Sequence, residues 1–494
     1  MAARPFPDSE STRLDERSAE TGQIIDGFSY NDGCLGWAGG QLKDEDIITV
    51  TRTETNGVDA VCGYTIFSLE PANASDQAPP PFKLSTTSAS NLPQSFLDKH
   101  IFQGLPAHLD HNVNVLHILI SIRSGTGLAP QFFEEILESL IGALGLKSSG
   151  YNVVRTTSVE SVKEYAKSEL LVEANKGKKQ TVLMLSGDGG IVDVINGLLE
   201  SGNRSRYIPK LMICFACFSD RVLLTRNPPS AYTKPILSQL PLGTGNALFH
   251  SLHRPSSLPS IYIQGFRTLL HGTTRPLPIF RATFSAGARA LTNEAQTVTP
   301  LRNNTLYGAV VASYGLHATL VADSDTTEYR KHGNKRFGFV ANDLLYPPGG
   351  GNPHAYEADV FLTKNHEKQE VVGRKQHGYI LASLVSNLEK TFTISPASKP
   401  LDRQLRVVHF GPLGGKKAME IMMEAYNNGN HVGMEEVSYE SAEAMRINFL
   451  EKGEDWKWRR CCIDGLIVGV EEGGWMEIQT VEGGSEAVDI VVDA

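Results

Sequence analysis

Ser186-Gly187-Asp188-Gly189-Gly190 and Pro241-Leu242-Gly243-Thr244-Gly245-Asn246 are two glycine-rich turns, and each follows a run of apolar residues. The first run covers residues 181–185 and the second covers 235–240, and an apolar segment of helical character follows each turn. A strand, a glycine-rich turn and a helix in this order direct backbone N–H groups toward a phosphate. Two such turns, one of them with an acid, predict a site for a nucleotide with a metal ion between its phosphates.

The same alternation of strands, turns and helices extends over residues 111–275. A strand at 113–120 precedes a third turn that contains Ser124, Gly125 and Gly127. Alternating strands and helices predict a parallel sheet with helices on both faces. Ligands of such sheets bind at the carboxyl ends of the strands, where all three turns lie. We therefore predict a Rossmann-like α/β nucleotide-binding domain with a parallel sheet.

The sequence pattern changes at residue 276, from alternating strands and helices to short apolar runs. Short apolar runs separated by turn residues, with one helix at 416–426, predict that 276–494 is a mostly β, antiparallel sandwich domain. Upstream, residues 21–110 are expected to form a small β-rich region that ends in a Pro/Ser-rich linker at 71–93. The polar residues 1–20 are expected to be a disordered tail.

Residues 201–235 interrupt the nucleotide domain. Connections between strands and helices in such domains usually take about 2–6 residues, and this one is far longer. It contains the pair Cys214 and Cys217, without the second pair that a structural zinc site would need. The segment is either an insert that forms a lid or an added strand, or a translated intron, and the sequence of the mature transcript would decide between them.

The composition excludes some functions. With 494 residues, a net charge of −9 and 20% charged residues, the chain has no basic footprint for nucleic acid or for steady attachment to anionic lipid. Six cysteines in this length do not form a disulfide framework, which fits a reducing compartment. The sequence has no apolar run long enough to span a membrane and no apolar core of a signal peptide. We expect a cytoplasmic protein.

The turn at 186–190, with Asp193, Asn196 and Gly197 downstream, and the later Pro-Leu-Gly-Thr-Gly-Asn-Ala together resemble the diacylglycerol kinase catalytic domain family, and within it the sphingosine kinases. The resemblance covers roughly 112–494. It implies a nucleotide domain followed by a β-sandwich lipid domain, with the active site between them. It also implies a lipid kinase that uses ATP and Mg²⁺ on the primary hydroxyl of a sphingoid base or related lipid, peripherally at intracellular membranes.

The resemblance also assigns roles to residues. Asp188 is expected to take the proton of the lipid hydroxyl and to hold Mg²⁺, although it could instead close its own turn. Arg330 and Arg336 are expected to bind phosphate, although both could lie on a solvated helix face. Asp464 could be only a hairpin turn residue, Asn246 a helix cap, and Thr156 an ordinary turn residue. The expected ATP-binding residues are Ser124, Gly125, Gly127, Thr156, Ser186, Gly187, Gly189, Gly190, Gly243, Thr244, Gly245, Asn246, Arg330, Arg336 and Asp464.

An acid for the lipid amine is expected just upstream of Arg330. Asp323 is the assignment for this substrate-binding carboxylate, and Asp325 is its rival. The sequence departs from the family at Ser121-Ile122, where the family has Asn-Pro, and at Leu466, where it has Glu. These departures keep a nucleotide-binding pseudokinase open as an alternative. An NAD kinase is the other alternative, because Asn293-Glu294 is similar to a motif of that family.

Overall fold

The structure is a computed structural model, and it describes residues 25–53, 63–71, 82–125, 127–200, 232–255, 258–333, 335–364, 367–370, 373–453, 456–481 and 487–493. The chain divides into two compact units, one holding Met1–Leu69 and Ser85–Phe102 and the other holding Glu70–Leu84 and Gln103–Ala494. The expected tail at 1–20 and residues 201–231 of the expected insert lie outside the described residues.

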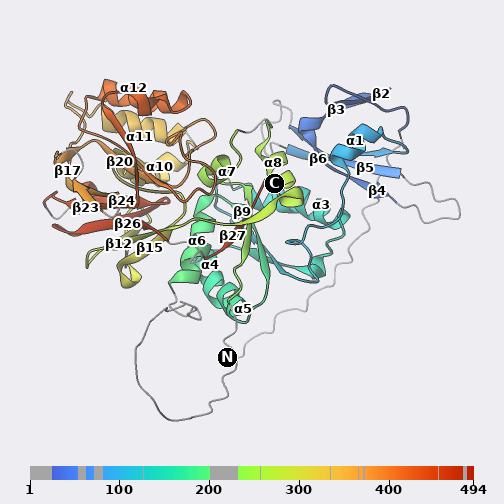
Figure 1. Cartoon of the computed structure of the whole chain (residues 1–494), viewed down its shortest axis with the longest axis horizontal. Coiled ribbons are helices and arrows are strands. Elements are labelled where there is room, and N and C mark those ends of the chain that lie inside the picture. The colour runs from blue at the N-terminus through green and yellow to red at the C-terminus, as the bar shows by residue number, and fades with distance from the viewer. Residues whose placement is uncertain are drawn as a thin grey trace, which may run out of the picture. The chain divides into compact units, whose positions relative to one another are not determined.

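The first unit contains two small antiparallel sheets, drawn in blue in Figure 1. Leu35, Ile47, Val50, Ile66 and Phe96 are fully buried in its core. The elements are β1 Ser29–Asn31, β2 Cys34–Trp37, β3 Gly40–Lys43, a 3₁₀ turn at Asp44–Asp46, β4 Ile47–Thr53, β5 Gly63–Pro71, β6 Phe82–Ala89 and α1 Gln94–His100. The expected linker at 71–93 is therefore wrong in part, because pairing with β5 makes its Ser/Thr-rich second half a strand.

The second unit begins with a mostly parallel sheet in the order β11-β27-β10-β9-β7-β8. Its strands are β7 Val115–Ile120, β8 Tyr151–Arg155, β9 Gln180–Ser186, β10 Ile236–Pro241, β11 Thr273–Pro276 and β27 Asp489–Val492. Strands β9 and β10 pair in parallel with Pro241 opposite Ser186. Because the two strands end in register, the glycine-rich turns that follow them start side by side.

Helices connect these strands. They are α2 Ala129–Phe132 and α3 Glu138–Ala143 with a π-helical turn between them, α4 Ser161–Tyr165 and α5 Leu171–Asn175 with a π-helical turn between them, α6 Asp188–Leu199, α7 Ala247–Leu252, and α8 Ile261–His271. Apolar side chains of α4–α7 pack on Val182, Met184 and Leu237 of the sheet. The predicted α/β class of this part is confirmed.

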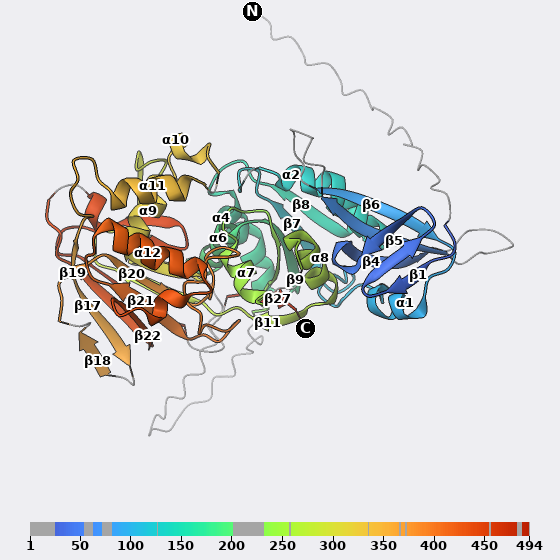
Figure 2. The ribbon, with the colours of Figure 1, turned by 90° about the horizontal axis from the view of Figure 1, so that it is seen from above.

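Two antiparallel sheets follow (Figure 2). One contains β12 Phe280–Phe284, β15 Thr305–Gly308, β17 Tyr356–Lys364, β18 Glu367–Glu370, β19 Gln376–His377, β23 Ala444–Phe449 and β26 Trp475–Thr480. The other contains β13 Arg289–Thr292, β14 Thr297–Pro300, β16 Val311–Gly315, β20 Tyr379–Ser383, β21 Leu405–Phe410, β22 Val437–Ala442, β24 Arg460–Ile463 and β25 Leu466–Gly469. Apolar side chains of both sheets share one core, so the predicted antiparallel β region is confirmed.

Strand β20 shows how the second sheet divides its two faces. Ile380 and Ala382 belong to the core between the sheets, whereas Tyr379 and Leu381 join the cluster on the opposite face. This alternation follows from the two-residue period of a strand. The face that carries Tyr379 is the one that turns toward the functional site described below.

Helices cover that face (Figure 2): α9 Leu316–Ser324, α11 Lys335–Leu345 and α12 Gly415–Tyr426, with the short α10 Thr327–Arg330 between the first two. The sequence predicted only the last of them, at 416–426. The pattern of α9 is weak because Leu316, Ala318 and Thr319 are all buried, so the helix lacks a clear polar side. Among the described residues, no helix combines the length and apolar character needed to span a bilayer.

Two further expectations need correction. Residues 391–395, one of the short apolar runs from which the sequence predicts sandwich strands, have only an isolated bridge, between Asn387 and Thr393. The C-terminal β27, expected in the sandwich, lies between β10 and β11 of the first sheet. The chain thus returns to its parallel sheet at the end, and the boundary at residue 276 stays a prediction.

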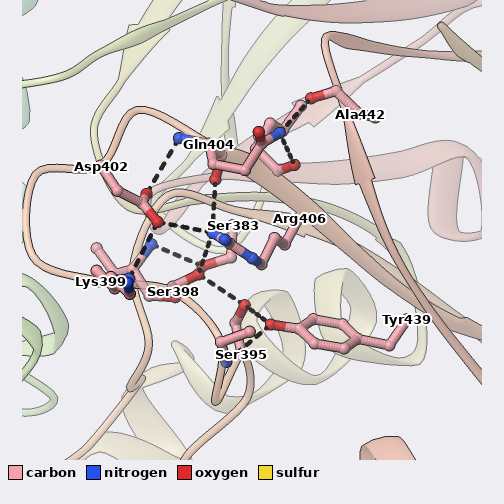
Figure 3. A network of polar contacts seen from close by, with 12 residues as sticks. Ser383, Ser395, Ser398, Lys399, Asp402, Gln404, Arg406, Tyr439 and Ala442 are labelled. Atoms are coloured by element: carbon pink, nitrogen blue, oxygen red, sulfur yellow. Dashed lines mark hydrogen bonds and ion pairs between the residues drawn. The ribbon is translucent and has the colours of Figure 1, made fainter. Parts of the chain in front are cut away.

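A polar network braces the loop that leads into β21 (Figure 3). The Tyr439 and Ser395 hydroxyl oxygens lie 2.7 Å apart, and the Arg406 guanidinium donates to Asp402 at 2.9 Å. These contacts fix the outer strands β21 and β22, on which Tyr439 and Arg406 lie. They stabilise the sheet whose other strands line the site.

Candidate active site

The glycine-rich turns line a cavity of about 740 Å³ in the second unit. One part of its wall is made of the turns, including Gly125, Gly187 and Gly243. Another part is apolar and comes from the helices over the second antiparallel sheet: Leu316, Leu320, Phe337, Leu345, Met419, Met422 and Met423. One cavity therefore has a polar wall, made of the backbone of the turns, and an apolar wall, against which a hydrocarbon chain could pack.

The two turns that opened the sequence analysis touch each other. A Cβ atom added to Gly243 would lie 2.3 Å from the Gly187 Cα, and one added to Gly187 would lie 3.0 Å from the Gly243 Cα. Only glycine permits so close an approach of two backbones. The sequence predicted both turns, and the structure brings them together.

The third turn joins the same contact. Gly125 has a φ of +56°, and its added Cβ would lie 2.7 Å from the Leu242 carbonyl oxygen. The Ser124 hydroxyl accepts a hydrogen bond from the Gly187 amide at 2.9 Å. Thr156 is buried outside the cavity lining, where its hydroxyl accepts from the Ile122 amide. Thr156 therefore supports the turn that carries Ser124 and does not itself face the cavity.

Asn246 closes the second turn. It has a left-handed φ of +51°, and its side chain accepts from the Gly243 amide at 3.0 Å and donates to the Gly243 carbonyl at 3.1 Å. It occupies the residue before α7, but its side chain bonds the turn and not the helix. Of the remaining expected turn residues, Gly189, Thr244 and Gly245 line the cavity. The buried Ser186, the partly buried Gly190 and the exposed Gly127 lie outside its lining.

Asp188 links the two principal turns. Its carboxylate accepts hydrogen bonds from the Ala247 amide at 2.6 Å and the Leu248 amide at 3.1 Å, at the start of α7. Burial raises the pKa of Asp188, and these amides act in the opposite direction. The Ala247 and Leu248 amides therefore donate to Asp188, a side chain of this protein, and not to a ligand. The half-buried carboxylate still lines the cavity and keeps unused acceptor lone pairs.

Asp464 faces the same cavity from the antiparallel region. It sits with Gly465 in the hairpin between β24 and β25, and both residues have a positive φ. Its carboxylate accepts from the amides of Ala309 at 2.5 Å and Val311 at 2.6 Å. Burial raises the pKa of Asp464 to about 7 against the effect of these amides, and the charge of Asp188 adds to the rise. It is both a turn residue and a cavity residue.

The two arginines expected to bind phosphate lie in different surroundings. Arg336 lines the cavity, is mostly buried, and its Nε has no hydrogen-bond partner among the described residues. Arg330 lies outside the cavity lining with its side chain exposed, and it donates to Asp325 at 2.7 and 3.0 Å. The structure therefore places Arg336, and not Arg330, in the wall of the cavity that the turns line.

The two candidate acids for the lipid amine also separate. Asp323 lies outside the cavity lining, and its carboxylate accepts from Arg460 at 2.8 Å. Asp325 lines the cavity but is already bonded to Arg330 and lies 3.8 Å from Arg336. Each acid has a cationic partner, so neither stands as a free counter-ion for an ammonium group.

Other residues of the cavity wall carry no role in the sequence analysis. His317 and Tyr379 line it, as do Glu160 and Lys163 from the region of α4. Glu160 and Lys163 belong to an ordinary amphipathic stretch, and nothing in the sequence there indicates a place in a cavity wall. His317 directly follows the pair Gly315-Leu316 in an apolar run, and a polar residue in such a run was the one available hint.

Asp193 on α6 makes the cavity sensitive to pH. Burial raises its pKa to about 7, Glu160 and Glu200 add to the rise, and Lys163 opposes it. An acid with a raised pKa in the folded state stabilises the fold most below its unfolded pKa, and this contribution is lost as pH rises through about 7. Asp193→Asn should therefore have a flatter dependence of Tm on pH between 5 and 8.

That comparison is made by thermal unfolding in EDTA. We expect the wild-type Tm to fall relative to the variant by about 3 °C over this range. Parallel curves for the two proteins would contradict the raised pKa of Asp193.

The carboxylates of the cavity are too few to hold a divalent ion by themselves, but they could hold one together with a bound nucleotide. Among the described residues, no group of three or more His, Cys, Asp or Glu side chains could hold a metal ion. Asp188 and Asp464, whose charges repel, do share the cavity. Mg²⁺ commonly binds through one or two carboxylates plus substrate phosphates and water, so the residues present fit an ion that arrives with a nucleotide.

A comparison with known protein families finds a match over part of the chain. Residues 116–282 match the family model of the diacylglycerol kinase catalytic domain. The matched stretch contains all three glycine-rich turns and Asp188. Arg336, Tyr379 and Asp464 lie beyond its end and complete the cavity from the antiparallel region.

Solved structures from Bacillus anthracis str. Sterne are similar to this chain. One titled as a diacylglycerol kinase is 12% identical, with 77% of this chain and 97% of that one covered and a TM-score of 0.42. Two others, whose titles give this activity as an assignment, have TM-scores of 0.46 and 0.45 at 12% and 13% identity with the same coverage. No curated protein matches the chain.

Proposed function

We propose that the chain is an ATP-dependent lipid kinase that transfers the γ-phosphate to the primary hydroxyl of a lipid, a sphingoid base or a related molecule. One observation carries the proposal: the three glycine-rich turns and a wall of apolar helices line the same cavity. A nucleotide triphosphate suits the first wall and a hydrocarbon chain suits the second. The match to the family model of the diacylglycerol kinase catalytic domain supports the same activity.

The triphosphate would lie against the turns. The Gly187 and Gly243 amides already donate to Ser124 and Asn246, so the backbone of Gly189, Thr244 and Gly245 in the cavity wall is what a phosphate would approach. Arg336 has a buried guanidinium nitrogen without a partner among the described residues, and a phosphate oxygen would satisfy it. These groups stabilise charge that develops on the transferred phosphoryl group.

Asp188 would accept the proton of the acceptor hydroxyl. Its raised pKa makes it a stronger base than an ordinary carboxylate, and the Ala247 and Leu248 amides hold it in place. The proton moves from the lipid hydroxyl to a free lone pair of the carboxylate as the oxygen attacks the γ-phosphorus. The bond from the γ-phosphorus to the β,γ-bridging oxygen breaks, and ADP leaves.

Asp188 and Asp464 are the residues that would hold Mg²⁺ with the nucleotide. When bound, the ion would offset charge on the phosphates and relieve the repulsion between the two carboxylates.

The acceptor lipid would enter from a membrane surface. Phe339 of α11 and Met423 and Tyr426 of α12 are exposed, and the last two also line the cavity. Apolar side chains at a cavity mouth favour contact with a bilayer from which one lipid is withdrawn. We propose peripheral attachment to intracellular membranes and no role for nucleic acid.

The test is transfer of label from [γ-³²P]ATP with Mg²⁺ to sphingosine, diacylglycerol or ceramide, followed by thin-layer chromatography. We expect a labelled phospholipid that depends on protein and on time. Transfer to NAD instead of any lipid would replace the proposal by an NAD kinase. Tight ATP binding without transfer to any acceptor would replace it by a pseudokinase, in keeping with Leu466 at the place of the family glutamate.

A further inference from the structure

The apolar part of the cavity contains a buried hydroxyl without a partner. Tyr379 lines the cavity, its side chain is 1% exposed, and its hydroxyl oxygen has no hydrogen-bond partner among the described residues. Buried polar groups in folded proteins almost always have a partner, in the chain, in water or in a ligand. A phenylalanine would fill this place at no such cost, so the hydroxyl needs an explanation.

The strand register directs Tyr379 to the cavity. It lies opposite Gly315 in the pairing of β20 with β16, and Ser313 lies opposite Leu381 on the same face. Its ring stacks on Phe410 at 5.2 Å between centroids and 12° between planes. Stacking and register fix the ring, so the hydroxyl is held in one place and does not sample many positions.

His317 is a polar neighbour of the Tyr379 ring. Its ring lies edge-on to Tyr379, with 6.0 Å between centroids, and it also lines the cavity. Its Nδ1 lies 2.7 Å from the buried Ser313 hydroxyl, which fixes the imidazole from behind. Burial lowers the pKa of His317 to about 4, so the ring is neutral near pH 7.

Neither member of this pair carries a charge for a ligand amine. A neutral phenol and a neutral imidazole bind hydroxyl or carbonyl oxygens and not ions. The acids expected to bind an ammonium group, Asp323 and Asp325, are bonded to Arg460 and Arg330. The pair therefore offers neutral hydrogen bonds to an acceptor in the apolar part of the cavity.

We propose that Tyr379 and His317 form a polar subsite that binds a neutral oxygen group of the acceptor lipid, a hydroxyl or carbonyl other than the hydroxyl that is phosphorylated. The subsite rests on the proposed kinase function and determines its specificity. It selects lipids that carry such a group over lipids that present only hydrocarbon there, because the latter leave the Tyr379 hydroxyl unpaired.

Matched lipid pairs and Tyr379→Phe test the subsite. Sphinganine and 3-deoxysphinganine differ by one hydroxyl, and dioctanoylglycerol and its dialkyl ether differ by the ester carbonyls. For one pair or both, we expect the wild type to prefer the oxygen-bearing lipid by about tenfold in kcat/KM. Tyr379→Phe should remove most of that preference. An unchanged preference in the variant would overturn the subsite and leave the kinase function standing.

A second readout does not require phosphate transfer. Because Tyr379→Phe removes an unpaired hydroxyl and keeps the stacked ring, the lipid-free variant should have a Tm equal to that of the wild type or about 2 °C higher. The rise in Tm on adding the oxygen-bearing lipid should be smaller in the variant. If the wild type transfers no phosphate, the kinase function fails, and these shifts still decide the subsite. Equal lipid-induced shifts in both proteins would overturn it.

Discussion

Asp188→Asn is expected to lower the kcat of phosphate transfer to lipid by about 10³-fold. The wild-type carboxylate lines the cavity, is held by the Ala247 and Leu248 amides, and has a raised pKa that suits a base. An asparagine amide cannot take the proton of the lipid hydroxyl. It would also turn an N–H₂ group toward one of the two amides, which removes a hydrogen bond. Initial rates at saturating ATP and lipid measure the loss.

The control for this experiment is Asp323→Asn. It removes the same charge from an acid that is bonded to Arg460 and lies outside the cavity lining. We expect its kcat to stay within about twofold of the wild type. Titration with ATP shows whether the site of Asp188→Asn is intact, and its Kd should rise by no more than about tenfold. If Asp188→Asn keeps most of the wild-type kcat, Asp188 is not the base.

Gly243→Ala is expected to weaken ATP binding by about 100-fold. The added Cβ would lie 2.3 Å from the Gly187 Cα and 2.8 Å from both the Gly187 nitrogen and the Asn246 Oδ1. The atoms of two backbones cannot yield as the end of a flexible side chain can, so the turns must move apart. We expect a stability loss of about 2 kcal/mol and a Tm about 2 °C lower. Calorimetric titration and thermal unfolding measure the two effects.

Gly189→Ala is the matched variant for this prediction. Gly189 lines the same cavity, but an added Cβ would meet no atom within 4 Å. Its Tm should stay at the wild-type value or rise slightly, since alanine favours a helix more than glycine does. Any loss of ATP binding in Gly189→Ala then reports a direct contact with phosphate. If Gly243→Ala keeps both the Tm and the ATP affinity of the wild type, the contact between the turns is not essential.

The parts of the fold that follow from local pattern were predictable from the sequence. Strands β9 and β10 are buried apolar runs that end at glycine-rich turns, and the parallel sheet follows from their alternation with helices. Helix α9 was not predicted because its buried and apolar residues do not gather on one side, which removes the periodic signal. Strand β27 escaped because its four residues gain their partners from strands about 210 to 250 residues earlier.

The candidate site was predictable in its turns and less so in its side chains. Gly187 and Gly243 indicate close contact between two backbones, because glycine has no Cβ atom. The partners of Asp323 and Asp188 depend on residues brought near by the fold, namely Arg460 for the first and the α7 amides for the second. The unpaired hydroxyl of Tyr379 is a property of its surroundings, and a tyrosine in an apolar run carries no sign of it.

The central claim is that the turns at 186–190 and 241–246 bind one nucleotide triphosphate together. Hydrogen exchange of the wild-type chain, followed by mass spectrometry with and without ATP and Mg²⁺, tests it most directly. The account predicts slower exchange of peptides that contain these two turns, at an ATP concentration that also saturates one site per chain. Exchange that ATP leaves unchanged in both turns, or slows only elsewhere, would contradict it.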